Sequence, residues 1–148
     1  EALTKFAATT TLKTDNKAAW LQRMILAGLA PIDLKTQGLF TPDQLNYLHH
    51  HAVSLDKGCY VGQEIIARLF HLGQSKKHLY QIKCELPEGL PESRVLTIDG
   101  KPCGHIICMA SLATETIGLA VIKTATANES AYLEQTFGKL QLIPCHNS

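Results

Sequence analysis

The sequence predicts an α+β fold in which helices come first and a small antiparallel β-barrel follows. Up to Gly73, apolar residues recur at the spacing of a helix, whereas beyond it they alternate with polar residues as in a strand. Turn-forming residues then return at short intervals, which is typical of an antiparallel barrel or sandwich. We therefore expect a helical part over residues 1–73 and a barrel domain over residues 74–148.

The first helix is expected over residues 16–27. Thr14 or Asp15 can cap its start, and Gly28 can end it because glycine accepts the left-handed backbone found after helix C-termini. One apolar stripe runs along the segment and predicts its buried face. The stripe consists of Trp20, Leu21, Met24, Ile25 and Ala27.

Residues 41–48 predict a second, shorter helical turn. Thr41 stands at the cap and Pro42 at the first helical position, where its missing N–H costs nothing. Gln44 completes a capping-box pattern with Thr41.

Residues 62–72 predict a third helix, with Gly73 as its stop. Glu64 and Arg68 are spaced for an ion pair one turn apart. The face expected to be buried consists of Ile65, Ile66, Leu69 and Leu72.

Beyond Gly73 the alternating pattern predicts five to seven strands between about Lys77 and Ile143. It is clearest over residues 79–86, a half-buried strand whose apolar positions are Tyr80, Ile82, Cys84 and Leu86. Further strands are expected at residues 94–98, 103–109, 117–123 and 140–143. Turn signals separate them at residues 87–91, Asp99-Gly100, 113–116, 126–130 and Gly138.

The charge balance argues against a surface that binds nucleic acid or an anionic membrane. The 148 residues include 14 Lys and Arg against 13 Asp and Glu, a net charge of +1, with no basic stripe. No apolar stretch approaches the roughly 20 residues that a spanning helix requires. The first residue is Glu1 and no secretory signal follows it, so we expect that it is not a native start.

The five cysteines predict free thiols in a reducing compartment, most simply the cytoplasm. Their number is odd and none forms a C-x-x-C pair, so a disulfide framework is not expected. The run of residues 49–51 consists of three histidines, which suits either a metal site or a solvated loop. We favour the loop and expect no metal, because no Cys or carboxylate ligand stands at a useful spacing.

The segment richest in chemistry is residues 57–64, which read KGCYVGQE and lead directly into the third helix. Free backbone N–H groups and the helix dipole, with Lys57, favour the thiolate of Cys59. Gly58 and Gly62 allow a tight backbone that exposes the thiol. Glu64 opposes this effect with its negative charge. A buried, inert Cys59 and a purely structural Glu64 are the alternatives.

The string KGCYVGQEIIAR, residues 57–68, resembles the signature of the YgfZ family. Members of that family bind folate, support iron-sulfur enzymes and are often named tRNA-modifying proteins; they are related to the aminomethyltransferase of the glycine cleavage system. The resemblance extends to a helix that begins near Trp20 and ends at Ala27-Gly28, and to Phe40-Thr41-Pro42 with Asn46. It covers the chain from about Trp20 onward.

The resemblance implies that this chain is the C-terminal half of a protein with three parts around a central hole, where a tetrahydrofolate binds. Residues 1–73 would be the C-terminal part of the central α+β folate-binding region, and the folate site would be incomplete in this chain. Two departures put aminomethyl transfer in doubt. Gln44 replaces the acid of the transferase, and Leu26 stands where the family commonly has Glu.

The resemblance also assigns roles within the signature. Cys59 is the functional thiol, and the folate-binding candidates are Lys57, Tyr60, Gln63, Glu64 and Arg68. Each has a plainer alternative. Tyr60 can be a packed aromatic, Arg68 can pair with Glu64, and Lys57 can be solvated.

The predicted function is a folate-binding accessory protein that supports assembly or repair of iron-sulfur enzymes, with an indirect effect on tRNA modification. Its partners would be a folate and iron-sulfur enzymes or assembly proteins, and independent catalytic turnover is not expected. A single thiol cannot hold a cluster, so Cys59 would act transiently. The alternative is a folate-dependent one-carbon enzyme, and direct binding of tRNA is a third hypothesis. The sequence does not determine the oligomeric state.

Overall fold

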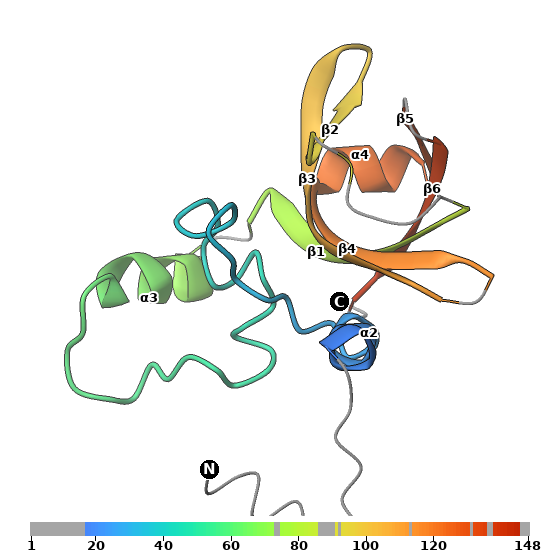
Figure 1. Cartoon of the computed structure of the whole chain (residues 1–148). Coiled ribbons are helices and arrows are strands. Elements are labelled where there is room, and N and C mark those ends of the chain that lie inside the picture. Colours follow the sequence, from blue (N-terminus) through green and yellow to red (C-terminus); the bar gives the residue numbers. More distant parts are fainter. Residues whose placement is uncertain are drawn as a thin grey trace, which may run out of the picture.

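The computed structural model describes residues 17–72, 75–85, 91, 93–112, 114–130, 132–135 and 138–145. Its helices are α2 (Lys17–Leu26), α3 (Gln63–Leu72) and α4 (Thr124–Glu129). Its strands are β1 (Lys77–Cys84), β2 (Val95–Ile98), β3 (Lys101–Ser111), β4 (Thr116–Lys123), β5 (Tyr132–Gln135) and β6 (Gly138–Pro144). Figure 1 shows the strands curled into one body, with α2 against it and α3 set apart.

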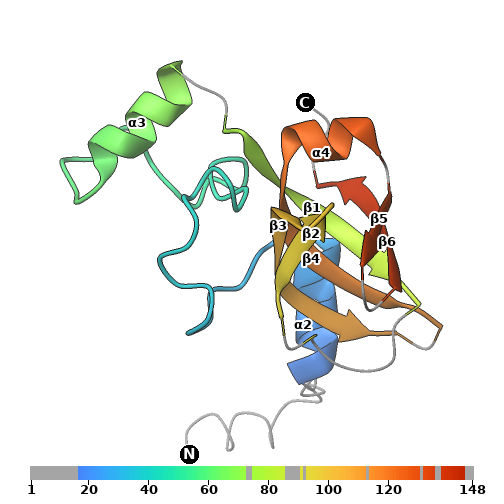
Figure 2. The same cartoon turned by 90° about the horizontal axis from the view of Figure 1, so that it is seen from above.

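The six strands form one antiparallel sheet in the order β2-β3-β4-β1-β6-β5, which confirms the predicted α+β fold with a small barrel. The sheet curls so far that its two edge strands, β2 and β5, face each other (Figure 2). Gln135 on β5 joins them. Its Nε2 donates a hydrogen bond to the Thr97 carbonyl (2.9 Å), and its Oε1 accepts one from the Thr97 amide (3.2 Å). One side-chain amide therefore continues the ladder where backbone pairing stops.

The sheet is packed on both of its faces. Inside the barrel lies a core that includes Ile82, Leu96, Ile106, Ile122 and Leu140. On the outer face lies a second core that includes Ile25, Leu79, Ile107, Leu119 and Val121. Consecutive residues of β4 therefore alternate between two buried environments, and the strand has almost no solvent-facing side.

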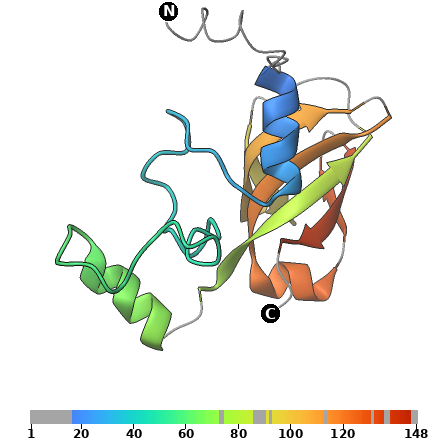
Figure 3. The same ribbon diagram turned by 90° about the horizontal axis from the view of Figure 1, so that it is seen from below.

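Helix α2 covers the outer face of the sheet, where it lies against β3 and β4 (Figure 3). It ends at Gly28, whose φ of 67° is left-handed, as the sequence predicted. The amide of Leu29 donates to the carbonyl of Met24 and that of Gly28 to Ile25, which is the Schellman arrangement. Gln81 on β1 then donates its side-chain N–H to the carbonyl of Ile25 (3.1 Å), so the helix end is tied to the barrel.

The predicted buried face of this helix needs correction. Ile25 is buried, but Trp20 is 61% exposed and Ala27 is also exposed. The helix touches the sheet along a narrow line centred on Ile25, so the outer residues of the stripe face solvent. The proposed caps Thr14 and Asp15 lie outside the described residues.

Residues 41–48 form turns and not the predicted helical turn: the Asn46 amide donates to the Asp43 carbonyl and the Tyr47 amide to the Pro42 carbonyl. The capping contact itself is present, since the side-chain oxygen of Gln44 accepts a hydrogen bond from the Thr41 amide (3.3 Å). The helix fails at Asn46, whose φ of 64° is left-handed and breaks the helical hydrogen-bond series. Of the predicted capping box, the Gln44 contact is therefore present, but the Thr41 hydroxyl caps no backbone amide, and the left-handed Asn46 was not predicted.

The barrel differs from the prediction at its C-terminal end. Helix α4 occupies residues predicted to be a turn, and β5 was not predicted as a strand. The only buried side chain of β5 is Leu133, so alternation gives little signal there. By contrast, Asp99-Gly100 makes the expected hairpin turn between β2 and β3, with φ values of 48° and 72°.

Two expectations fall partly outside the described residues. Gly73 and most of the turn predicted at residues 87–91 are not described, and the division into domains at residue 73 stays a prediction. Over the described ranges, no helix is long and apolar enough to cross a membrane.

The side-chain closure of the barrel predicts a measurable stability effect. Gln135→Ala removes both hydrogen bonds to Thr97 and leaves the two edge strands unjoined, so we expect a loss of about 1–2 kcal/mol in the free energy of unfolding. Urea unfolding followed by circular dichroism measures it. Gln141→Ala, at an exposed position on β6, is the matched control and should change stability by less than about 0.5 kcal/mol. Equal stability of the two variants would contradict the closure.

Candidate functional site

The loop before α3 is organised by the side chain of Gln63. Its Oε1 accepts a hydrogen bond from the Tyr60 amide (3.3 Å), and its Nε2 donates to the Lys57 carbonyl (3.5 Å). The Gln63 amide in turn donates to the Tyr60 carbonyl (3.1 Å), and Gly62 takes a left-handed φ of 88°. One glutamine therefore closes the turn that presents residues 58–61.

Cys59 lies on this turn and is exposed, just before the N-terminus of α3. The other four thiols differ. Cys84, Cys103 and Cys108 are buried and Cys145 is half-buried. Burial raises the pKa of Cys108 to about 12 and that of Cys145 to about 11, which suppresses their thiolates. Cys59 is thus exposed, as expected from the flanking Gly58 and Gly62, and it contrasts with the buried or half-buried cysteines of the barrel.

The remaining candidates of the signature occupy different environments. Lys57, Glu64 and Arg68 are exposed, whereas Tyr60 and Gln63 are half-buried. The predicted pair between Glu64 and Arg68 does not form; the ion pairs found within the described ranges are Lys83–Glu115 and Arg94–Asp33. Glu64 and Arg68 are thus both open to partners, and their assignment to folate stays a prediction.

The face of α3 predicted to be buried is at most half-buried: Ile65 is exposed, Ile66 and Leu69 are half-buried, and the side chain of Leu72 lies outside the described residues. Ile65 is 62% exposed, Phe70 is 58% exposed and Val61, on the preceding turn, is fully exposed. None of the described α3 side chains is buried, because the helix stands away from the barrel in every view (Figures 1 and 3). The helical pattern was interpreted correctly, but the residues that the structure describes cover its apolar side only in part.

A second group of polar residues was missed by sequence reasoning. Thr41 Oγ1, Asp43 Oδ1 and Asn46 Nδ2 are buried atoms without a hydrogen-bond partner, and so is Tyr60 Oη in the signature loop. Buried polar atoms are nearly always paired, so these four atoms indicate partners that the described residues do not supply. In the sequence, Thr41, Asp43 and Asn46 are ordinary turn residues, so their pattern gave no indication of a binding site.

Gln44, which replaces the transferase acid, is used structurally. Besides accepting from the Thr41 amide, it donates from Nε2 to Ser75 Oγ (3.3 Å), which ties this segment to the start of β1. An amide so engaged cannot act as a general acid or base. Leu26, the second departure, is 60% exposed.

The histidine run does not gather a metal-ligand set. His50 Nε2 lies 3.2 Å from the Gly28 carbonyl, and the rings of His49 and His50 meet edge to face. Over the part of the chain that the structure describes, no three His, Cys, Asp or Glu side chains are placed to hold a metal ion.

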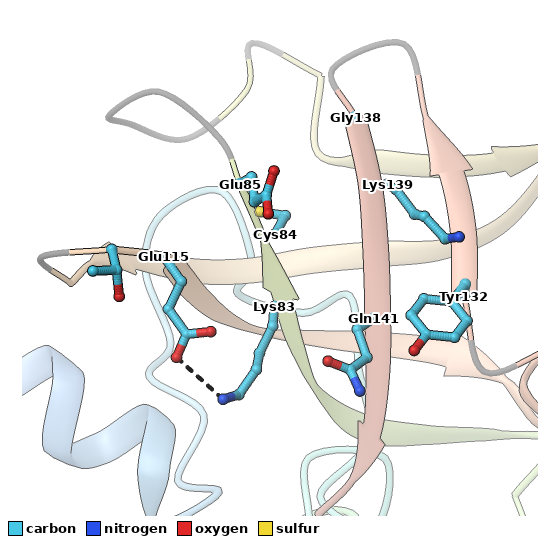
Figure 4. Close-up of a pocket in the computed structure, with 9 residues that line it drawn as sticks. Lys83, Cys84, Glu85, Glu115, Tyr132, Gly138, Lys139 and Gln141 are labelled. Carbon is cyan, nitrogen blue, oxygen red and sulfur yellow. Dashed lines mark hydrogen bonds and ion pairs between the residues drawn. The ribbon is translucent and has the colours of Figure 1, made fainter.

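A groove of about 550 Å³ lies beside β1 and β6 (Figure 4). Both of its lysines have partners, since Lys83 pairs with Glu115 (3.1 Å) and Lys139 lies over the ring of Tyr132, 4.6 Å from its centroid. The charged group that remains in the lining is Glu85, and one exposed carboxylate does not by itself indicate a ligand.

These features define a class: an α+β protein with a near-closed antiparallel barrel and an exposed cysteine on a glycine-flanked turn. A scan of family models finds none that matches the chain. Curated relatives do match. The chain is 46% identical over 66 residues to "tRNA-modifying protein YgfZ" of Buchnera aphidicola, which covers 45% of this chain and 21% of that protein.

Proteins of the same name from two other bacteria are also similar to this chain. The Serratia proteamaculans protein is 31% identical over 107 residues, 70% of this chain and 32% of its own length. The Colwellia psychrerythraea protein is 31% identical over 85 residues, which cover 57% of this chain and 26% of that protein. The chain is similar to these YgfZ proteins and spans about a quarter of the length of the curated relatives it matches.

The burial contrast predicts the order of thiol labelling. A small maleimide should modify Cys59 first, Cys145 more slowly, and Cys84, Cys103 and Cys108 only when the barrel opens. Mass mapping of a time course on the native chain measures the order, with a sample in denaturant as the control in which all five react. Faster modification of Cys84 than of Cys59 would be inconsistent with this structure.

Proposed function

We propose that the protein containing this chain is a folate-binding accessory factor that supports assembly or repair of iron-sulfur enzymes in the cytoplasm, with Cys59 as its working thiol. The observation that carries the proposal is the exposed Cys59 on a turn held by Gln63, while the other four thiols are buried or half-buried. The relatives are named tRNA-modifying. An effect on tRNA through an iron-sulfur enzyme accounts for that name without a basic surface on this chain.

The chemistry available to Cys59 is transient ligation. After losing its proton to solvent, the thiolate supplies one bond to an iron atom of a client's cluster, while the client's own thiolates supply the others. Release restores the free thiol. The exposure of Val61 and Ile65 beside Cys59 leaves apolar surface on which a client protein can pack.

The unpartnered atoms suit a folate. A pterin presents N–H donors and ring acceptors along one edge, and the orphan set offers a carboxylate acceptor at Asp43, an amide donor at Asn46 and hydroxyls at Thr41 and Tyr60. These four residues would hold the pterin. The exposed Lys57 and Arg68 carry the charge that attracts the glutamate tail of a folate. When bound, the folate would supply a one-carbon unit or a reduced ring.

The role of the thiol is tested by Cys59→Ala in the full-length protein. We expect loss of support for iron-sulfur enzymes with a stability change of no more than about 1 kcal/mol, because an exposed side chain contributes little to a core. Complementation of a deletion strain, read as the activity of an iron-sulfur tRNA-modifying enzyme, is measured beside a thermal melt. Cys145→Ala, which removes a half-buried thiol, is the control and should complement. Full complementation by Cys59→Ala would remove the thiol from the mechanism.

The folate site is tested by Tyr60→Phe. This change deletes a buried hydroxyl that has no partner among the described residues, so stability of this chain should be unchanged or slightly higher. Affinity for tetrahydrofolate, measured by calorimetry with the full-length protein, should fall about tenfold. Glu129→Gln, on the exposed end of α4, is the control variant and should bind tetrahydrofolate as the parent does. Unchanged affinity in both Tyr60→Phe and Asp43→Asn would place the folate elsewhere.

A further inference from the structure

A second cavity, of about 360 Å³, lies between the segment around Phe40 and the outer face of the barrel. Its floor is a cross-strand row in which Val95, His105 and Val121 are register partners on β2, β3 and β4. Leu39 and Phe40 form the opposite wall, and the Phe40 and His105 rings meet edge to face at 5.6 Å. None of the signature residues 57–68 lines it.

Two lysines at this cavity stand in an unfavourable position. Lys77 on β1 and Lys123 on β4 are directly opposite in the register, and both line the cavity. Like charges directly opposite in an antiparallel pair destabilise a sheet. Lys123 donates from Nζ to the Pro102 carbonyl (2.6 Å), but within the described ranges no carboxylate pairs with either ammonium group. Two exposed lysines therefore stand at one cavity without a carboxylate partner among the described residues.

His105 adds an independent observation at the same cavity. Its Nε2 atom is buried and has no hydrogen-bond partner. Burial lowers the pKa of His105, and the neighbouring Arg94 and Lys77 lower it further against the opposing effect of Asp33, so the ring is neutral near pH 7. A neutral imidazole protonated on Nε2 has one N–H donor to offer.

We infer that this cavity binds a small organic anion, whose phosphate or carboxylate group is held by Lys77, Lys123 and His105 while an attached ring packs on Phe40. An anion supplies the counter-charge for the opposed lysines and the acceptor for His105. The apolar walls and the volume fit a single ring better than a bare ion. The inference is independent of the proposed role of Cys59.

The test is a titration of the ¹⁵N-labelled chain followed by amide chemical shifts. Phenyl phosphate and benzoate present the two anions on the same ring, and benzyl alcohol presents the ring without charge. We expect saturable shifts at residues 103–105 and 121–123 with at least one anion and none with benzyl alcohol. The tighter of the two anions identifies the phosphate or the carboxylate as the natural group. Absence of saturation with both, or equal response to benzyl alcohol, would overturn the inference.

Variants locate the binding. The double variant Lys77→Gln with Lys123→Gln should bind about tenfold more weakly or worse, since it removes two charge-assisted partners. It should be no less stable than the parent, because it also removes the opposed charges. Lys101→Gln, an exposed lysine of β3 outside the cavity, is the matched control and should bind as the parent does.

Two further variants complete the test. His105→Phe fills the position without a donor and should also weaken binding, with a thermal melt to verify the fold. Cys59→Ala should bind as the parent does, which separates failure of this inference from failure of the proposed function. Parent-like affinity in both the double variant and His105→Phe would overturn the inference.

Discussion

The structure depends on one strand, β4, that is buried on both faces. Seven consecutive residues from Thr116 to Ile122 are buried, and they alternate between the barrel interior and the layer beneath α2. Gly118 permits this density, because a Cβ atom there would lie 2.6 Å from the Cys108 carbonyl oxygen of β3. A strand without a solvent-exposed face must be covered on both sides. The barrel interior covers one side of β4, and α2 with the segment after it covers the other.

The fold was predictable wherever burial imposed a period on the sequence. The hairpin at Asp99-Gly100, the cap at Gly28 and the alternation of β1 each follow from a rule that acts within a few residues. Failures occurred where long-range packing decides. Strand β5 buries a single side chain, and its pairing with β6 defines it as a strand. The segment after Thr41 is not helical, because the backbone of Asn46 is left-handed. Neither cause is visible in a local window.

The candidate site divides in the same way. The exposure of Cys59 followed from flanking glycines and from its place before a helix, both of which are local features. The predictions that Glu64 pairs with Arg68 and that Ile65 is buried were wrong, because helical spacing permits such contacts without requiring them. Among the described residues, none covers Ile65. The orphan atoms of Thr41 and Asp43 had no signal at all, since an absent partner leaves no trace in the sequence.

The segment between α2 and α3 connects these features physically. It is held to the barrel by Arg94, which is 11% exposed and donates both to Asp33 (3.0 Å) and to the Ile107 carbonyl (3.2 Å). Phe40 closes the lysine-lined cavity, and the next residue, Thr41, carries the first unpartnered hydroxyl. Of these two consecutive residues, Phe40 therefore lines the cavity proposed to bind an anion, and Thr41 carries a hydroxyl without a hydrogen-bond partner. The barrel positions both, because its outer core fixes the segment from which they project.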